Sequence, residues 1–314
     1  MKSSSLEPPL DAGIRMDPVI TVKTGVNSLP VTAPCGGTAF GCPRDFLDNR
    51  FVYAVISPRA RGLSVGVNMN PDKLCNFDCA YCEVNRAEPA CESRLDVSAM
   101  VAELERTLEL VRSGGLAELP RYRNAPPELL QLRHVALSGD GEPTLCPNFL
   151  EVVEAVAHLR ARGRLPFFKL VLITNATFLN RLEVIDGLRL FTPRDEVWAK
   201  LDAGTQAYVA RVNKTDFTLE MILANILTLA RQRPVVIQSL FPSVSGEAPP
   251  AGEIEAYVQR LRKLKEAGAQ IPLVQIYSAT RPAAHSECGH LPLRTLSHIA
   301  QRVREGSGLR AEVF

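Results

Sequence analysis

Apolar positions between residues 46 and 314 follow two alternating patterns. Short apolar runs, bounded by turn-forming residues, predict strands at 63–67, 134–137, 169–173, 197–201, 235–240 and 273–277. Between them, apolar residues recur every three or four positions, as at Val101, Leu104 and Leu108. This spacing predicts helices near 101–111, 149–159, 182–188, 219–229, 254–264 and 293–303.

Six strand–helix units in series predict a parallel sheet, because parallel strands need a long crossover connection. Six units fall short of the eight in a complete barrel. We therefore expect an α/β protein with a partial (β/α)6 TIM-like barrel at 46–314, with a doubly wound sheet as the alternative. Residues 1–45 show little periodicity, which predicts an irregular N-terminal arm with at most a short strand at 19–22.

Composition places the chain among ordinary globular proteins, with 46% hydrophobic and 22% charged residues. A formal net charge of +2 gives no global positive field for nucleic acid. No apolar run approaches the ~20 residues of a membrane span, and the first residues lack the apolar stretch of a signal peptide. We expect a cytoplasmic protein with no membrane contact.

The cysteines are unevenly spread, because three of the eight lie between positions 75 and 82. Cys75, Cys79 and Cys82 have the spacing C-x3-C-x2-C, and thiolates are the usual ligands of iron–sulfur clusters. Three thiolates hold three irons of a four-iron cluster and leave the fourth open, as in catalytic metal sites. The alternatives are a zinc site, although no second C-x2-C is present, and a closed electron-carrier cluster with Cys91 as fourth ligand.

With Tyr81 included, this segment reads C-x3-C-x-aromatic-C and resembles the signature of the radical S-adenosylmethionine (SAM) superfamily. The resemblance implies that Cys75, Cys79 and Cys82 are the catalytic ligands of a [4Fe–4S] cluster whose fourth iron chelates SAM. It also implies reductive cleavage of SAM to a 5′-deoxyadenosyl radical that abstracts hydrogen from a substrate. Tyr81 would then lie close to the adenine, although an ordinary packed aromatic explains it equally well.

A second match follows the second strand, where residues 138–143 resemble the family's Gly-Gly-Glu segment that binds the SAM amino group. By this resemblance Gly141 and Glu142 are cofactor-binding residues. A carboxylate accepts hydrogen bonds from an ammonium group, and glycine lets the backbone approach a ligand. Asp140 departs from the family pattern, since it stands where the first paired glycine is usual. A simple strand-to-helix turn is the alternative.

Polar residues also follow later strands, at the barrel end where substrate sites are built. By family analogy we assign Asn175, Lys200 and Gln238 to the SAM ribose or carboxylate, although strand ends are polar for solvation too. His285, Cys288 and His290 form an H-x2-C-x-H group that a polar loop explains better than a metal site. Arg59 and Arg61 are candidates for contacts with RNA phosphates or an electron donor, with a solvated face as the default.

Segments 68–71, 141–145 and 274–278 narrow the likeness to the branch containing the tRNA wyosine-base synthases. That branch uses a Schiff-base lysine, for which Lys200 is conceivable, and a second cluster on N-terminal cysteines. Only Cys35 and Cys42 precede Cys75, so a third ligand is missing. We expect a tRNA or nucleotide substrate and a flavodoxin or ferredoxin as electron donor. The alternatives are a radical activase or peptide modifier acting on a protein, or a non-catalytic iron–sulfur or zinc protein.

Overall fold

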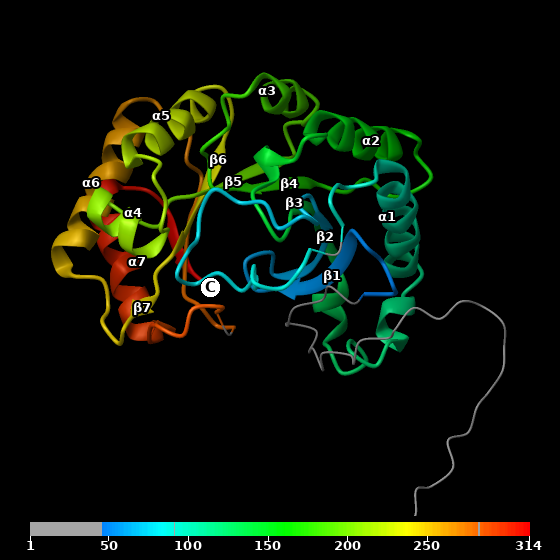
Figure 1. The fold of residues 1–314 in the computed structure, drawn as a ribbon, viewed down its shortest axis with the longest axis horizontal. Helices are drawn as coiled ribbons and strands as arrows, with labels where there is room; N and C mark the ends of the chain where they lie inside the picture. The colour runs from blue at the N-terminus through cyan, green and yellow to red at the C-terminus, as the bar shows by residue number, and fades with distance from the viewer. Residues whose placement is uncertain (1–45, 91, 282) are drawn as a thin grey trace, which may run out of the picture. The chain divides into compact units, whose positions relative to one another are not determined.

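The computed structural model describes residues 46–90, 92–281 and 283–314 (Figure 1). The strands are β1 (Val52–Ser57), β2 (Gly62–Asn68), β3 (Leu132–Ser138), β4 (Leu170–Thr174), β5 (Glu196–Lys200), β6 (Val235–Leu240), β7 (Ser243–Val244), β8 (Val274–Tyr277), β9 (Cys288–Gly289) and β10 (Ala311–Val313). The α-helices are α1 (Val97–Arg112), α2 (Phe149–Ala161), α3 (Leu182–Arg189), α4 (Gln206–Val212), α5 (Leu219–Ala230), α6 (Ala251–Glu266) and α7 (Leu293–Ser307). Short 3-10 helices lie at η1 (Gly115–Glu118), η2 (Pro127–Leu130) and η3 (Pro143–Leu145).

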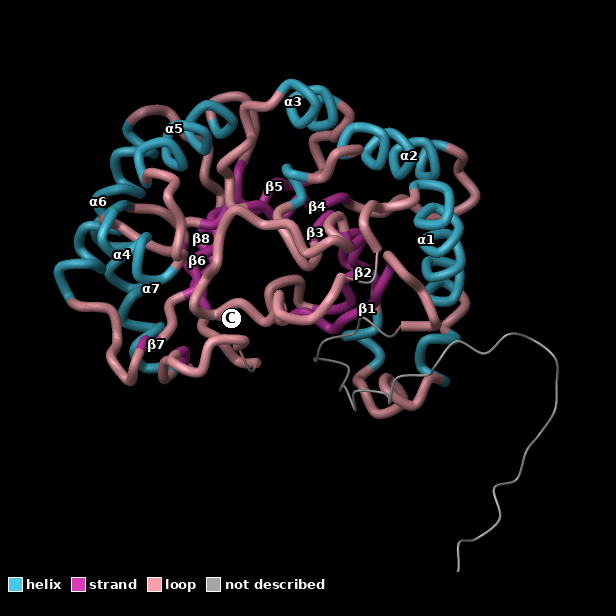
Figure 2. Tube along the Cα trace, viewed as in Figure 1, coloured by secondary structure: helices cyan, strands magenta, loops and turns pink. Residues whose placement is uncertain are grey.

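Eight of the described strands form one sheet in the order β1-β2-β3-β4-β5-β6-β8-β10. All neighbours from β2 to β10 are parallel. The sheet curls, and the long helices lie along its outer side (Figures 1 and 2). The predicted partial barrel is confirmed, with the six expected strands as β2, β3, β4, β5, β6 and β8. A doubly wound sheet, which has helices on both faces, is excluded.

The element sequences explain this arrangement. Every residue of β2 is buried, as expected for a parallel strand covered on both faces. Helix α1 turns Met100, Leu104 and Leu108 into the main core between sheet and helices. Its first turn is capped by Asp96, whose carboxylate accepts a hydrogen bond from the Ala99 amide. Local pattern and tertiary packing therefore agree.

The structure adds elements that the apolar pattern did not predict. β1 pairs antiparallel with β2, β10 extends the far edge beside β8, and the short helix α4 follows β5. β1 alternates buried and half-buried residues, whereas β10 has three residues and α4 has seven. Such short elements carry too few periods to stand out, because their stability comes from the neighbours they pair with.

The turn between β1 and β2 reaches the opposite edge of the sheet. Arg61 pairs with the carboxylate of Glu312 in β10, and its guanidinium carbon lies 5.7 Å from the centre of the Phe314 ring. Arg59 lies over Tyr277 at the end of β8, with 4.2 Å between the guanidinium carbon and the ring centre. This hairpin turn therefore joins β1 and β2, on one side of the sheet, to β8 and β10 on the other.

The inner face of the curled sheet has its own small core. Val171, Trp198 and Val236 pack together on adjacent strands, apart from the helix-covered core. Side chains two positions apart on a strand share a face, so Lys200 lies on the same face as Trp198, and Gln238 on the same face as Val236. The inner face is thus apolar in the middle and polar toward the C-terminal ends of the strands.

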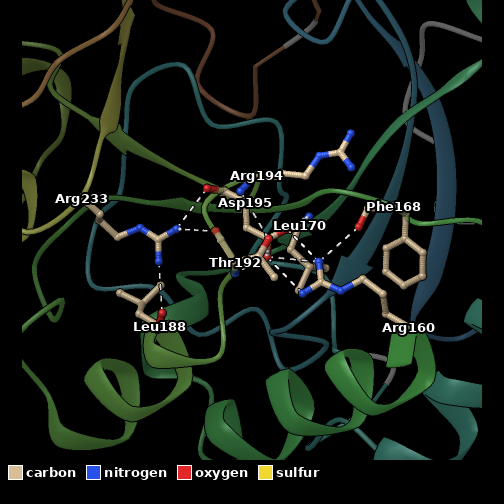
Figure 3. Close-up of polar contacts among 8 residues, drawn as sticks. All are labelled: Arg160, Phe168, Leu170, Leu188, Thr192, Arg194, Asp195 and Arg233. Carbon is tan, nitrogen blue, oxygen red and sulfur yellow. Dashed lines mark hydrogen bonds and ion pairs between the residues drawn. The ribbon is translucent and has the colours of Figure 1, made fainter. Parts of the chain in front are cut away.

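At the N-terminal edge of the sheet, Asp195 is the centre of a buried polar network (Figure 3). Its carboxylate pairs with Arg160 at 2.8 Å and accepts hydrogen bonds from the amides of Leu170 and Thr192. Arg233 donates to the backbone oxygens of Leu188, Thr192 and Asp195. This network ties together the chain segments that enter β4, β5 and β6.

None of the described helices has the length and apolar character needed to cross a lipid bilayer. The expected N-terminal arm at 1–45, with its possible strand at 19–22, lies outside the described residues. So do Cys35, Cys42 and Cys91, the candidates for a second cluster or a fourth ligand. Their assignments remain predictions.

Candidate iron–sulfur and SAM site

The cysteine loop, residues 69–82, follows β2 at the C-terminal edge of the sheet. Backbone hydrogen bonds attach it to two other parts of the barrel. Leu74 accepts a hydrogen bond from the Glu142 amide after β3, and the amides of Asp78 and Ala80 donate to the segment that ends α4. The loop is therefore held in place by the β3 and β5 crossovers as well as by β2.

Each of the three predicted ligands receives a hydrogen bond on sulfur. The Phe77 amide lies 3.4 Å from Cys75 Sγ, Asn213 Nδ2 lies 3.5 Å from Cys79 Sγ, and Arg86 Nη1 lies 3.3 Å from Cys82 Sγ. Donors of this kind stabilise thiolates and tune the clusters they hold. The surroundings of the three sulfurs therefore suit thiolate ligands.

The three thiols are half-buried and free of disulfides. Burial raises the pKa of Cys75 to about 11 and that of Cys79 to about 12. Both side chains therefore carry protons at neutral pH in the metal-free chain. Metal binding must release these protons, which makes loading of the site dependent on pH.

The side chain of Asn70, at the start of the cysteine loop, indicates whether the loop suits a bound group. Asn70 is fully buried, and neither its amide oxygen nor its amide nitrogen has a hydrogen-bond partner. A side chain on Gly141 would collide with Asn70 and with the backbone of Leu74, so the β3 loop packs tightly on the cysteine loop. Unsatisfied buried amides are uncommon in proteins, and this one, at the start of the cysteine loop and against Gly141, fits a site that binds a further group.

Across the described ranges, no three His, Cys, Asp or Glu side chains converge as ligands of a single metal ion do. His285 instead contacts Asp78 at 3.1 Å, and His290 contacts the Ala279 carbonyl. Cys288 lies in the short strand β9. These contacts agree with the polar-loop interpretation of the H-x2-C-x-H group.

Tyr81 connects the cysteine loop to the end of β5. Its hydroxyl donates to the carboxylate of Asp202, which also accepts from Asn213 Nδ2 at 2.9 Å. Lys200 lies 3.4 Å from Asp202 and 3.2 Å from the Tyr277 hydroxyl, with its ammonium 4.9 Å from the Tyr81 ring centre. Burial alone would lower the pKa of Lys200, but the charges around it raise the pKa above its ordinary value. Lys200 is therefore positively charged at neutral pH.

The carboxylate of Glu142 already accepts hydrogen bonds from other residues of the protein. One carboxylate oxygen accepts hydrogen bonds from the amide and hydroxyl of Thr144 and from the Thr174 hydroxyl. The other oxygen accepts from the Asn175 amide at 2.7 Å and keeps room for one further donor. Glu142 thus fastens β3 to β4, and only its second oxygen is open to the predicted ammonium contact.

The other two assigned residues lie in the same region with different partners. Asn175 donates to Asn76 in the cysteine loop at 2.7 Å and accepts from Thr177. Gln238 is paired across the strands with Lys200 on one side, and on the other it donates to Gln275 at 2.9 Å. The structure therefore joins Tyr81, Lys200 and Cys79 in one network through Asp202 and Asn213. It places Gln238 beside Lys200, and Glu142 and Asn175 after the ends of β3 and β4, respectively.

Sequence reasoning missed Asn213 and Arg86, and it placed Asp202 among the polar residues after the strands without giving it a role. Asn213 and Arg86 donate to cysteine sulfurs, and Asp202 joins Tyr81, Asn213 and Lys200. Asn213 follows a short helix that the apolar pattern did not predict, so nothing in the sequence pointed to it. Arg86 lies four residues after Cys82, and this proximity was the available signal.

Comparison with known proteins gives relatives in sequence and in fold. No protein-family model matches the chain. The chain is 29% identical to the UPF0026 protein slr1464 of Synechocystis over 184 residues, which are 58% of this chain and 60% of that protein. It is 24% identical to a UPF0026 protein of Helicobacter pylori over 242 residues, 75% of this chain and 70% of that protein. The chain thus spans about three fifths of the first of these relatives.

Among solved structures, TYW1 with a lysine–pyruvate adduct matches with a TM-score of 0.54 at 13% identity, covering 82% of this chain and 85% of that chain. SuiB of Streptococcus suis bound to S-adenosylmethionine also matches with a TM-score of 0.54 at 13% identity, covering 78% of this chain and 49% of that chain. Both are radical SAM enzymes. The fold of this chain is therefore that of the radical SAM enzymes, the superfamily its cysteine motif resembles.

Proposed function

We propose that this chain is an enzyme that binds a [4Fe–4S] cluster through Cys75, Cys79 and Cys82 and cleaves SAM reductively. The observation that carries the proposal is the cysteine loop at the C-terminal edge of a radical SAM-type barrel, with one hydrogen-bond donor at each sulfur. A bound cluster would supply an electron and one open iron position for SAM. The protein's own part is to hold and orient these ligands.

The residues around the loop suit a charged ligand. Lys200 is a half-buried cation beside Tyr81. This favours an ion pair with the SAM carboxylate over a Schiff base, since a Schiff base forms from a neutral amine. We assign Gly141 and the open oxygen of Glu142 to the SAM amino group, and Asn175 and Gln238 to its ribose. Tyr81 remains the proposed neighbour of the adenine.

For the substrate we propose a tRNA or nucleotide, with a flavodoxin or ferredoxin as electron donor. The support is the motif likeness to the wyosine-base branch. The fold does not choose between substrates, because TYW1 and SuiB match with equal TM-scores. Salt-dependent binding of tRNA would support this substrate, because phosphate contacts release counterions. Stable capture of a protein partner would support an activase or peptide modifier.

The deciding experiment is 5′-deoxyadenosine formation after anaerobic cluster reconstitution, with dithionite and SAM. Wild type should give a slow product without added substrate, and Cys79→Ala should give none. The matched control is Cys288→Ala, which removes a half-buried thiol outside the loop and should leave the product unchanged. An assembled cluster that neither cleaves SAM nor changes its spectrum with SAM would contradict the proposal and favour an electron carrier. Zinc without sulfide would favour a structural site.

A further inference from the structure

Arg59 is a charged side chain directed at the inner face of the barrel. It lies on the β1–β2 turn, and its guanidinium carbon is 4.2 Å from the centre of the Tyr277 ring. Tyr277 is two positions beyond Gln275 on β8 and is mostly buried, so it belongs to the same inner face as Lys200 and Gln238. The turn thus brings a cation from one edge of the sheet onto the face that carries the candidate site.

The charge of Arg59 is not neutralised by its neighbours. Its Nε is buried and has no hydrogen-bond partner, and within the described part of the chain no carboxylate forms an ion pair with it. Arg61, two residues along the same turn, differs because it pairs with Glu312. A guanidinium group has five donors and binds carboxylates and phosphates in a bidentate manner.

A second cation shares the Tyr277 ring. Lys200 Nζ lies 5.5 Å from the ring centre and 3.2 Å from the ring hydroxyl. The carboxylate that faces Lys200, Asp202, already accepts hydrogen bonds from Tyr81, Asn213 and the Leu240 amide. Two cations therefore flank one aromatic ring, and the nearby negative charge is shared among several donors.

The charge of Arg59 also influences a buried histidine on the inner face. His134 packs against Trp198 with 5.2 Å between ring centres. Burial, together with the charges of Lys169 and Arg59, lowers the pKa of His134 to about 3. His134 is therefore neutral, and Trp198 packs against the imidazole whose pKa Arg59 influences.

We infer that Arg59, beside Tyr277 and Lys200, binds the anionic group of the substrate, a carboxylate or a phosphate. Arg59 supplies the bidentate donors, while Lys200 stays with the SAM carboxylate and adds only longer-range positive charge. The inference rests on the proposed function, since the site adjoins the Lys200–Asp202–Tyr81 network that leads to the cysteine loop. It adds that the reacting molecule is an anion held from the hairpin turn, separately from the iron-bound end of SAM.

The chain provides its own reporter for a test. It has a single tryptophan, and Trp198 lies on the inner face. The full metal-free chain would be titrated with malonate and with inorganic phosphate at constant ionic strength, following Trp198 fluorescence. Calorimetry on the reconstituted chain saturated with SAM would repeat both titrations. The malonate and phosphate arms separate a carboxylate substrate from a phosphorylated one.

We expect saturable binding of at least one anion to wild type. Arg59→Ala should weaken it at least ~10-fold, because charge-assisted hydrogen bonds of this size are lost. Arg59→Lys should lie between the two, and Arg61→Ala should bind like wild type. Circular dichroism would confirm that each variant is folded. If Arg59→Ala does not fold, Arg59→Gln takes its place, because it also removes the charge.

Two results would overturn the inference: no saturable binding of either anion to wild type, or equal binding by Arg59→Ala and wild type. The fluorescence titration needs neither cluster nor SAM cleavage. A failure to form 5′-deoxyadenosine would therefore count against the proposed function while leaving the anion result to be judged by itself.

Discussion

Two buried carboxylates, Asp195 and Glu142, lie at the N-terminal and C-terminal ends of the sheet strands and differ in whether a cation pairs with them. Asp195 at the N-terminal edge and Glu142 at the C-terminal edge each accept several hydrogen bonds from backbone amides and threonine hydroxyls. Asp195 also has Arg160 at 2.8 Å, whereas among the described residues no cation pairs with Glu142. The pKa of Glu142 is raised by burial, and that of Asp195 is lowered because its partners outweigh burial.

The difference shows what each edge is built to do. At the N-terminal edge, the charge of Asp195 is matched by Arg160 and its other partners are residues of the neighbouring strands and turns, as in a region that serves stability. At the C-terminal edge, Glu142 keeps an acceptor position, Asn70 has no partner, and donors are directed at three sulfurs. A carboxylate without a cation at one edge, beside a carboxylate paired with Arg160 at the other, is what a binding site adds to a stable scaffold.

The largest effect is expected at Asp195. Asp195→Ala leaves the buried guanidinium of Arg160 without its partner, and breaking a buried pair in this way costs about 3–5 kcal/mol. Urea unfolding would measure the loss. The control is Asp186→Ala, which removes an exposed pair with Arg189 and should cost about 0–1 kcal/mol. Equal losses in the two variants would remove the contrast between the edges.

An intermediate effect is expected at Arg86, and on the cluster rather than the fold. Arg86→Ala removes a charged donor from Cys82 Sγ, so the reduction potential of the reconstituted cluster should become more negative. A hydrogen bond of about 1.5 kcal/mol corresponds to roughly 60 mV for a one-electron couple. Redox titration followed by electron paramagnetic resonance would measure the shift.

Arg281→Ala is the matched control for Arg86, because Arg281 pairs with Glu83 next to the cysteine loop and donates to no cysteine sulfur in the described structure. Its potential should stay near the wild-type value, and unfolding in urea should change little in either variant. A large loss of stability in Arg86→Ala, with an unchanged potential, would make Arg86 a structural residue.

The smallest effects are expected from pH, and they have opposite signs at the two edges. The raised pKa of Glu142 means that its contribution is full below the ordinary value of 4.5 and is lost as pH rises through the folded pKa. The advantage of wild type over Glu142→Gln should therefore shrink with rising pH. The lowered pKa of Asp195 means that its contribution is present above 3.8 and is lost as pH falls.

The advantage of wild type over Asp195→Asn should accordingly shrink with falling pH. The sign of each change follows from the direction of the pKa shift. Urea unfolding at a series of pH values would give both curves. If the difference in unfolding free energy between wild type and variant changed with pH in the same direction for both variants, the two edges would not differ in charge matching.

The sequence was sufficient for the parts of the fold with long periodic patterns. All six barrel strands were predicted, because central parallel strands are nearly continuous apolar runs. β10 and α4 could not be found, since three- and seven-residue elements depend on tertiary pairing. Within the candidate site, the spacing of the three cysteines marked them as ligands, and their assignment to a cluster stays a prediction.

The partners of the site residues were beyond prediction from sequence. Glu142 was expected to face SAM, but its contacts with Thr144 and Thr174 depend on how the ends of β3 and β4 meet. Asn213 acts on Cys79 although 134 residues separate them. A single asparagine carries no pattern, so only the folded arrangement reveals such a residue.

That separation has a consequence for how the protein is made. The cysteine loop is fixed by hydrogen bonds to residues 212 and 213, so its ligands take their places only after the chain beyond β5 has been synthesised and has folded. Contacts between distant segments form late, because a long loop must first be closed. Until then the thiols belong to a flexible segment that is open to oxidation. Iron should therefore enter a barrel that has already folded, and apoprotein produced without iron should keep its fold.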